Sequence, residues 1–350
     1  MKFPLADWID AHASCRHNLG ESGMAGSIRH PYPTPREVAA ADTEELRGIL
    51  AEHLGVEPGR IFLTHGASES NAAVLQYIAR SSARTPPRCR VRLPEYPPLV
   101  DFARWAGLIP AEGPGRVRLA LVSQPRNPEG DLWTADRLES WWDGAEHTLV
   151  DETFREFAGT PSWARSERRR LWVTGSLTKF FAGDDVRVGF LVAPDEERER
   201  YARVHGLWFD TLANYSVAAA VAILRARERV RRQVARILDP NRAMWARAFP
   251  GAPVPRGPVG FDRDLVPDGE VLAHRCLRAS VLVCSGRFFG DVGGVRLGLT
   301  RPSFPEDVRA YLGVRERLRA ATLRRSRGRG RFRPARRGPA AVARASAGPA

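Results

Sequence analysis

The chain has 350 residues, of which 43% are hydrophobic and 27% are charged, with 31 Gly and 27 Pro. This composition is typical of a globular protein with room for one large domain or for two that share a core. No run of 18 apolar residues occurs, and the first residues include acids and a Trp without an apolar stretch. We therefore expect neither a membrane span nor a signal peptide, and a cytoplasmic location.

The net charge of +14 is unevenly distributed along the chain. Nine Arg and no acid lie between Arg324 and Ala350, which leaves only +5 for the rest. This segment is of low complexity and has few apolar residues, so we expect residues 323–350 to form a disordered tail. Such a tail offers at most salt-dependent, sequence-independent affinity for nucleic acid, which we keep as a non-enzymatic alternative and do not expect as the function.

Strands and helices alternate through the first two hundred residues. The predicted elements, in chain order, are a helix over 36–54 closed by Gly55, a strand over 61–66, a helix over 68–81, a strand over 91–93 followed by a loop and a helix, a strand over 117–125, a helix over 134–142, a strand over 147–153, and strands over 171–176 and 186–193. This alternation predicts an α/β domain with a mostly parallel sheet.

The pattern changes after about residue 195. Helices are predicted over 196–206 and 214–236, and a smaller mixed segment follows, with helices near 268–278 and from 304 to about 320. We expect a second, smaller α+β domain. The predicted division is an N-terminal segment that joins the small domain, a large domain, a linker helix with the small domain, and the tail, with the bounds 1–30, 31–210, 211–322 and 323–350.

Lysine is rare in this chain, since only Lys2 and Lys179 occur and the other 52 cationic residues are Arg. An amine can lose its proton and form an imine, whereas a guanidinium cannot. Lys179 is therefore a candidate for covalent chemistry. The four Cys residues are scattered and form no CxxC pair, so we expect neither a disulfide framework nor a metal site.

Candidate ligand-binding residues follow the predicted strands at their carboxyl ends, where ligands collect in an α/β sheet. These residues are Gly66, Ala67, Ser68, Asn127, Asp151, Ser176, Thr178, Lys179 and Arg187. A helix N-terminus, hydroxyl groups and a fixed cation together make a phosphate site. A carboxylate at a strand end can keep a pyridine nitrogen protonated.

Their order and spacing resemble the fold-type-I, pyridoxal-phosphate-dependent aminotransferases of class I/II, most of all the histidinol-phosphate aminotransferase-like branch. The resemblance covers about residues 18–318, and its most specific part is the S-x-T-K element with Arg187 eight residues after Lys179. It implies a Schiff base between Lys179 and pyridoxal 5′-phosphate. It also implies that Asp151 faces the pyridinium and Asn127 the 3′-oxygen of the cofactor.

Further residues receive roles from this resemblance. Tyr96 corresponds to the aromatic residue that stacks on the pyridine ring, and Arg296 to the residue that binds the substrate α-carboxylate. Gly23 lies in the N-terminal loop that lines the substrate. Tyr32 corresponds to a tyrosine that reaches the phosphate of the neighbouring subunit, which implies a homodimer with shared active sites. Phe154 stands where relatives have a tyrosine beside the 3′-oxygen, and Glu129 replaces the Thr of an N-P-T-G motif.

We expect an aminotransferase of amino-acid biosynthesis that moves an amino group between an amino acid and a 2-oxo acid. A decarboxylase or a cyclase on the same fold stays an alternative, because the scaffold supports all three reactions. The S-x-x-K pattern over Ser176–Lys179 also fits penicillin-binding proteins. That chemistry requires a downstream K-T-G, and the chain has no third lysine for it.

Overall fold

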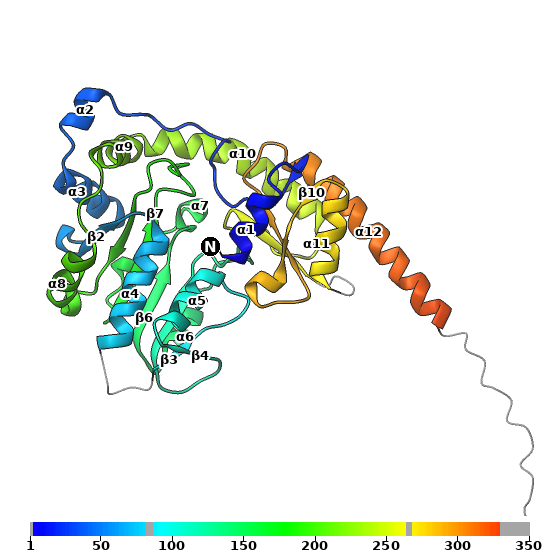
Figure 1. Ribbon diagram of the computed structural model, residues 1–350, viewed down its shortest axis with the longest axis horizontal. Helices are drawn as coiled ribbons and strands as arrows, with labels where there is room; N and C mark the ends of the chain where they lie inside the picture. Colours follow the sequence, from blue (N-terminus) through cyan, green and yellow to red (C-terminus); the bar gives the residue numbers. More distant parts are fainter. Residues whose placement is uncertain (1–2, 82–86, 264–267, 330–350) are drawn as a thin grey trace, which may run out of the picture.

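The computed structural model describes residues 3–81, 87–263 and 268–329, with side chains described as far as Thr322. Figure 1 shows a large lobe built around one sheet, a smaller lobe beside it, and the helix α12 (Phe304–Arg329) reaching away from the body. Among the described residues, no helix combines the length and the apolar character that crossing a membrane requires.

The large lobe contains a seven-stranded sheet. Its strands, in spatial order, are β2 (Ile61–Thr64), β8 (Gly189–Val192), β7 (Leu171–Ser176), β6 (Ala145–Asp151), β5 (Val117–Ser123), β3 (Arg88–Arg90) and β4 (Ile109–Ala111). Strand β8 runs antiparallel to β2 and β7, and the other neighbouring strands pair in parallel. The sheet is thus mostly parallel, as the alternation of strands and helices predicts.

Helices cover both faces of this sheet, and the side chains of β5 pack alternately against the helices on one face and on the other. Leu119 and Leu121 pack into one hydrophobic cluster, whereas Ala120 and Val122 pack into another. Because successive side chains of a strand point to opposite faces, a strand covered on both sides is apolar throughout. The first cluster includes residues of α4 (Ala67–Ser81), α5 (Pro97–Trp105) and α8 (Arg198–Trp208), and the second includes residues of α3 (Thr43–Leu54), α6 (Ala135–Trp142) and α9 (Asn214–Arg225).

The small lobe contains short strands and two long helices. An antiparallel sheet has the order β11 (Cys284–Ser285), β12 (Val295–Gly298) and β9 (Val259–Asp262), and α11 (Gly269–Arg278) and α12 pack beside it. The start of the chain returns to this lobe, since β1 (His17–Asn18) pairs in parallel with β10 (Val281–Leu282). The helix α1 (Pro4–Ala11) precedes β1. The predicted domain bounds at residues 30, 210 and 322 stay predictions.

Several predicted elements differ from the observed ones. The helix expected over 36–54 is two helices, α2 (Pro35–Ala39) and α3, because the side chain of Asp42 accepts a hydrogen bond from the amide of Glu44 and starts α3. The helix expected over 214–236 is likewise two, α9 and α10 (Arg227–Ala248). The strand expected over 91–93 is β3, three residues earlier.

The predicted disordered tail begins too early. Helix α12 continues to Arg329, so residues 323–329 are helical, in a stretch rich in Arg, which favours helices. The remainder of the predicted tail, residues 330–350, lies outside the described residues.

Candidate active site

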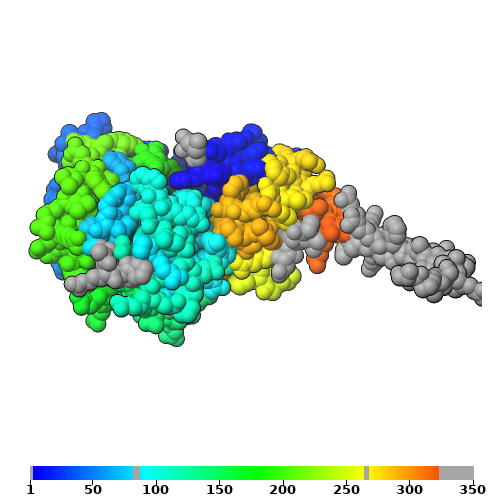
Figure 2. All heavy atoms as spheres, turned by 60° about the horizontal axis from the view of Figure 1, so that its bottom comes forward, coloured from blue at the N-terminus to red at the C-terminus, as the bar shows by residue number. Residues whose placement is uncertain are grey.

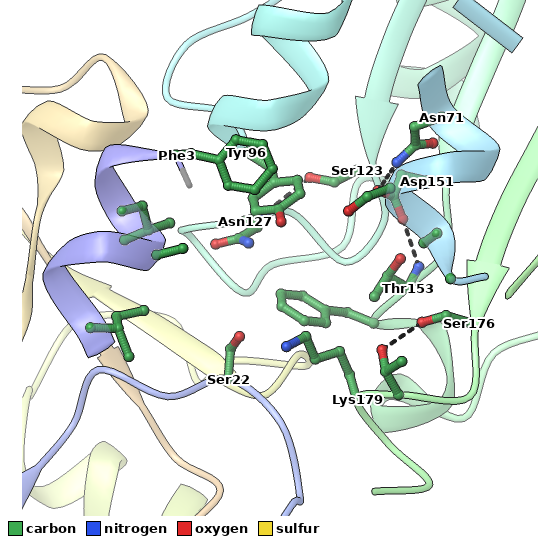
Figure 3. A pocket seen from close by; sticks show the side chains of 18 of the residues that line it. Phe3, Ser22, Asn71, Tyr96, Ser123, Asn127, Asp151, Thr153, Ser176 and Lys179 are labelled. Atoms are coloured by element: carbon green, nitrogen blue, oxygen red, sulfur yellow. Dashed lines mark hydrogen bonds between the residues drawn. The ribbon is translucent and has the colours of Figure 1, made fainter. Parts of the chain in front are cut away.

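A cavity of about 640 Å³ opens where the carboxyl ends of β5, β6 and β7 meet the start of α4 (Figure 3). Parallel strands deliver their carboxyl ends to the same edge of a sheet, so residues distant in sequence gather there. The predicted site residues in its wall are Gly66, Ala67, Ser68, Tyr96, Asn127, Asp151, Phe154, Ser176, Thr178, Lys179, Arg187 and Arg296. The structure thus brings all the predicted site residues together except Gly23 and Tyr32.

Lys179 lies in the connection between β7 and β8 and is directed into the cavity (Figure 3). Burial lowers the pKa of its amine, and the charges of Arg296 and Arg187 lower it further, while Asp184 acts in the opposite direction. A lowered pKa makes the neutral, nucleophilic amine available closer to neutral pH.

Asp151 ends β6 and is held by two hydrogen bonds. The side-chain amide of Asn71 donates to Asp151 Oδ2 at 2.8 Å, and the backbone amide of Thr153 donates to Oδ1 at 2.8 Å. Thr174 Oγ1 donates to Asn71 Oδ1 at 2.6 Å and so fixes the orientation of that amide. Burial raises the pKa of Asp151 above its ordinary value, and the hydrogen bonds from Thr153 and Asn71 act against this shift and favour the ionised form.

The turn between β2 and α4 forms a cradle of backbone amides. Gly66 has a φ of +108°, and a Cβ added to Gly189 would lie 2.3 Å from the carbonyl carbon of Gly66. Gly66 is therefore required by the conformation of the turn, and Gly189 by the close approach of β8 to it. Ser176 and Thr178, whose hydroxyls lie 2.8 Å apart, and Arg187 also line the cavity wall. This set of donors suits a phosphate group.

Arg296 extends from β12 of the small lobe into the same cavity and is 2% exposed. Its Nη2 donates to the carbonyl of Gly20 at 2.6 Å, and its Nη1 donates to Asn127 Oδ1 at 3.3 Å. Its Nε is buried and has no hydrogen-bond partner among the described residues. A buried guanidinium with an unused donor is suited to an anionic ligand.

Comparisons with known proteins agree with this geometry. Residues 89–245 match the family model of aminotransferase class I and II. Capreomycidine synthase from Streptomyces vinaceus is 28% identical, covering 93% of this chain and 96% of that protein. Histidinol-phosphate aminotransferase from Halorubrum lacusprofundi is 26% identical, covering 84% of this chain and 80% of that protein.

The fold is shared with a solved putative aminotransferase from Silicibacter pomeroyi, at a TM-score of 0.74 and 22% identity, covering 92% of this chain and 97% of that one. Residues 89–245 are thus similar in sequence to the class I and II aminotransferases, and the whole fold is that of a solved aminotransferase. The family has the fold-type-I architecture and depends on pyridoxal 5′-phosphate, so the predicted fold class, enzyme class and cofactor are confirmed. The roles of individual residues stay predictions.

The chain departs from the N-P-T-G motif of the family it resembles at Glu129, and the structure shows how it accommodates the change. The carboxylate of Glu129 lies 2.8 Å from Arg126 Nε and 2.6 Å from Arg263 Nη2. Arg263 follows β9 of the small lobe, so Glu129 links the loop of Asn127 to that lobe.

A second acidic residue, Glu95, stabilises the loop of Asn127 through hydrogen bonds to Ser123. It is 1% exposed and accepts hydrogen bonds from the amides of Tyr96 and Ser123, at 2.7 and 3.1 Å, and from the hydroxyl of Ser123 at 2.5 Å. That hydroxyl in turn accepts a hydrogen bond from the amide of Asn127 at 3.0 Å. Glu95 therefore orients two of the predicted cofactor-binding residues, Tyr96 and Asn127.

Two of the aromatic residues that line the cavity, Tyr96 and Phe154, differ in polarity. Burial and, to a lesser extent, the charge of Asp151 raise the pKa of Tyr96 to about 12, so its hydroxyl stays protonated. Phe154 follows β6 and presents a ring without a hydroxyl. The donor that relatives are expected to place beside Asn127 is therefore absent from this side chain.

Gly23 and Tyr32 lie outside the cavity wall. A Cβ on Gly23 would lie 3.2 Å from Lys179 Cδ, so this residue packs behind the lysine. Tyr32 is 63% exposed and its ring lies 4.7 Å from that of His30. Its expected role in a neighbouring subunit stays a prediction.

Sequence reasoning missed part of the wall. The missed residues are Phe3, Leu5, Ala6, Ile9, Asp10, Ser22, Asn71, Ser123, Pro125 and Thr153. Asn71 lies one turn after Ala67 on α4, a polar residue on a buried helix face, which is a usable signal. The residues of α1 carry no such signal, because an amphipathic helix packs against many kinds of surface.

Proposed function

We propose that this enzyme moves an amino group between an amino acid and a 2-oxo acid. The observation that carries the proposal is a single buried lysine, Lys179, in a cavity that also contains the oriented carboxylate of Asp151 and the guanidinium of Arg296.

The donor set fits pyridoxal 5′-phosphate. We assign its phosphate to the Gly66–Ser68 turn with Ser176, Thr178 and Arg187, where the close approach of Gly189 leaves no room for a Cβ. We assign its ring nitrogen to Asp151, its 3′-oxygen to Asn127, and its ring faces to Tyr96 and Phe154. A carboxylate held by two donated hydrogen bonds is a suitable partner for a pyridinium.

The cofactor supplies an aldehyde that condenses with amines and a ring that withdraws electrons from the bonds at the substrate Cα. Arg296 holds the substrate carboxylate, and its fixed position sets which Cα bond faces Lys179. Lys179 Nζ, whose pKa is lowered, takes the Cα proton and returns it to a neighbouring carbon. The buried setting of both groups excludes water from this transfer.

A decarboxylase or cyclase reaction is the second candidate. The similarity to capreomycidine synthase supports it, as does Phe154, which replaces the expected tyrosine donor with an apolar ring. The similarity to histidinol-phosphate aminotransferases supports transamination, which we favour. Nucleic-acid binding through residues 323–350 is the non-enzymatic alternative, and residues 330–350 lie outside the described part of the chain.

We further propose a cytoplasmic homodimer that acts in amino-acid biosynthesis. The exposed ring of Tyr32, beside His30, supports a contact with a second subunit. Sedimentation velocity checks the oligomeric state. Mixing the Tyr32→Phe variant with a Lys179→Arg variant tests shared sites, because heterodimers then regain one site with both residues intact.

An absorbance titration tests the proposed reaction. The purified enzyme, loaded with pyridoxal phosphate, is scanned with a panel of amino acids. Transamination predicts conversion of the cofactor band to that of pyridoxamine phosphate, with release of the 2-oxo acid. Release of carbon dioxide, or a product without a keto group, would instead assign the decarboxylase or cyclase reaction.

A further inference from the structure

We propose that the substrate is an amino acid with a long aliphatic side chain that carries no anionic group, and that helix α1 selects it. This inference rests on the proposed function and adds the substrate class. The residues that carry it lie in the part of the cavity wall that belongs neither to the sheet nor to the predicted cofactor site.

Helix α1 gives the cavity an apolar wall. Phe3, Leu5, Ala6 and Ile9 all line it, and Leu5 is 5% exposed. In the view of Figure 3, Phe3 lies on the same side of the cavity as Tyr96, opposite Ser22 and Lys179. A side chain that leaves the substrate Cα toward α1 therefore meets methyl and ring carbons, and burying aliphatic carbon there is favourable.

The wall is held in place from both lobes. The indole of Trp8 donates to the carbonyl of Val283 at 2.8 Å in the small lobe. The ring of Phe3 lies 6.2 Å from that of Phe102, in an edge-to-face contact with α5 of the large lobe. Figure 2 shows the N-terminal residues, in blue, between the two lobes. Helix α1 thus spans the junction between the lobes.

The charges of the cavity exclude an acidic side chain. The cationic side chains among its described wall residues are Lys179, Arg187 and Arg296, and the proposed mechanism assigns each of them to the cofactor or to the substrate carboxylate. A second carboxylate or a phosphate on the substrate would be buried without a counter-ion, which is costly. Asp10, at the exposed end of the α1 wall, adds a negative charge that opposes it further.

The test uses the cofactor-loaded enzyme with norleucine, ornithine, lysine, alanine, glutamate and histidinol phosphate. We expect norleucine or the cationic aliphatic amino acids to exceed both alanine and the anionic substrates by at least about tenfold in kcat/KM. Whether norleucine or ornithine is preferred distinguishes a neutral from a cationic end of the same aliphatic stem. A preference for glutamate or histidinol phosphate, or equal use of alanine, would overturn the proposal.

Two matched variants locate the selectivity on α1. Ala6→Arg places a cation in the wall and should shift the preference toward glutamate over norleucine by about tenfold, the effect of roughly one new charge pair. Ala11→Arg adds the same charge at an exposed position of α1 outside the cavity wall and should leave the preference unchanged. An equal shift in both variants would place the selectivity elsewhere.

A binding measurement separates this inference from the proposed function. Hexanoate and glutarate resemble the two substrate types but have no amino group to react. We expect hexanoate to raise the melting temperature of the loaded enzyme more than glutarate, and Ala6→Arg to reverse that order. If these ligands bind as expected but no amino acid changes the cofactor spectrum, the proposed function fails and the inference on substrate class stands. If glutarate binds better, the inference fails.

Discussion

The two ends of the active-site cavity are built in different ways. The end that we assign to the cofactor, called the cofactor end, comes from loops at the edge of one sheet, and its groups are polar and held by hydrogen bonds, such as the two bonds to Asp151. The substrate end combines α1 with β12, elements from opposite ends of the chain, and the contribution of α1 is mainly apolar.

This difference has a physical consequence. A hydrogen-bonded group has a required direction and distance, so loss of one partner leaves a buried polar atom unsatisfied. An apolar wall requires only shape and volume, and substitutions of similar size are tolerated. We therefore expect changes at the cofactor end to abolish or retune the chemistry, and changes at the substrate end to alter selectivity.

The largest effect is expected at the cofactor end, for Lys179→Arg. A guanidinium cannot form an imine with the cofactor at neutral pH, so turnover should be abolished. Borohydride treatment followed by peptide mass spectrometry should find the cofactor attached to Lys179 in the wild type and no adduct in the variant. Lys2→Arg, which changes the other lysine of the chain, is the control and should retain the adduct. An adduct on any other residue would contradict the assignment.

Arg296→Lys tests whether Arg296, which lies between the two ends of the cavity, binds the substrate carboxylate. The amine keeps the charge but loses the planar fork that contacts Gly20 and Asn127. We expect kcat/KM to fall about a hundredfold, mainly through KM, as for loss of a buried charged hydrogen-bond partner. Arg301→Lys, a half-exposed arginine outside the cavity wall, should change neither constant by much. An unchanged KM in Arg296→Lys would mean that another group binds the carboxylate.

Glu95→Gln tests whether the support beneath the cofactor end matters. An amide at this position places a donor where the carboxylate accepts from Ser123 and Tyr96. We expect a lower melting temperature and cofactor binding weakened by about tenfold, the cost of one mispaired buried group. Glu139→Gln, on the exposed face of α6, is the matched control. Unchanged cofactor affinity would remove Glu95 from the positioning of Tyr96 and Asn127.

Phe154→Tyr is expected to shift the pKa of the bound cofactor, because it adds a hydroxyl group and keeps the aromatic ring. The new hydroxyl would donate to the ionised 3′-oxygen and stabilise the deprotonated form of the bound cofactor. The pH midpoint of the cofactor absorption change should therefore fall by about one unit, the effect of one such hydrogen bond, and the pH optimum should become less alkaline. Phe157→Tyr adds a hydroxyl outside this cavity and should not move the midpoint. An unchanged midpoint in Phe154→Tyr would mean that the ring is not beside the 3′-oxygen.

The smallest effect is expected away from both ends, for truncation after Leu323. The last buried side chain of α12 among those described is Val314, at 5% exposure. Truncation should therefore change the melting temperature by less than about 2 °C and leave cofactor binding unchanged. A drop of several degrees in differential scanning fluorimetry would show that the C-terminal residues pack against the body.

Most strands and helices of the large lobe, and most residues of the cofactor end, could be predicted from local sequence patterns. Strands such as Leu171–Ser176 begin with an apolar run and are buried throughout because both faces of the sheet are covered, so their positions are visible in the sequence. Asp151 ends one such strand and Lys179 comes three residues after another, so the chain geometry places both at one edge of the sheet. Local sequence patterns are therefore sufficient to predict site residues that lie at the end of a strand.

The long-range contacts of the site and several element boundaries became visible only in the folded structure. The bond from Asn71 to Asp151, the support of Asn127 by Glu95 through Ser123, and the α1 wall join residues that are 28 to several hundred positions apart. Local patterns likewise did not reveal the break between α2 and α3 or the extent of α12. Such contacts depend on how separate elements pack, and many apolar or polar residues would satisfy the same local pattern, so only the packed fold selects the partners.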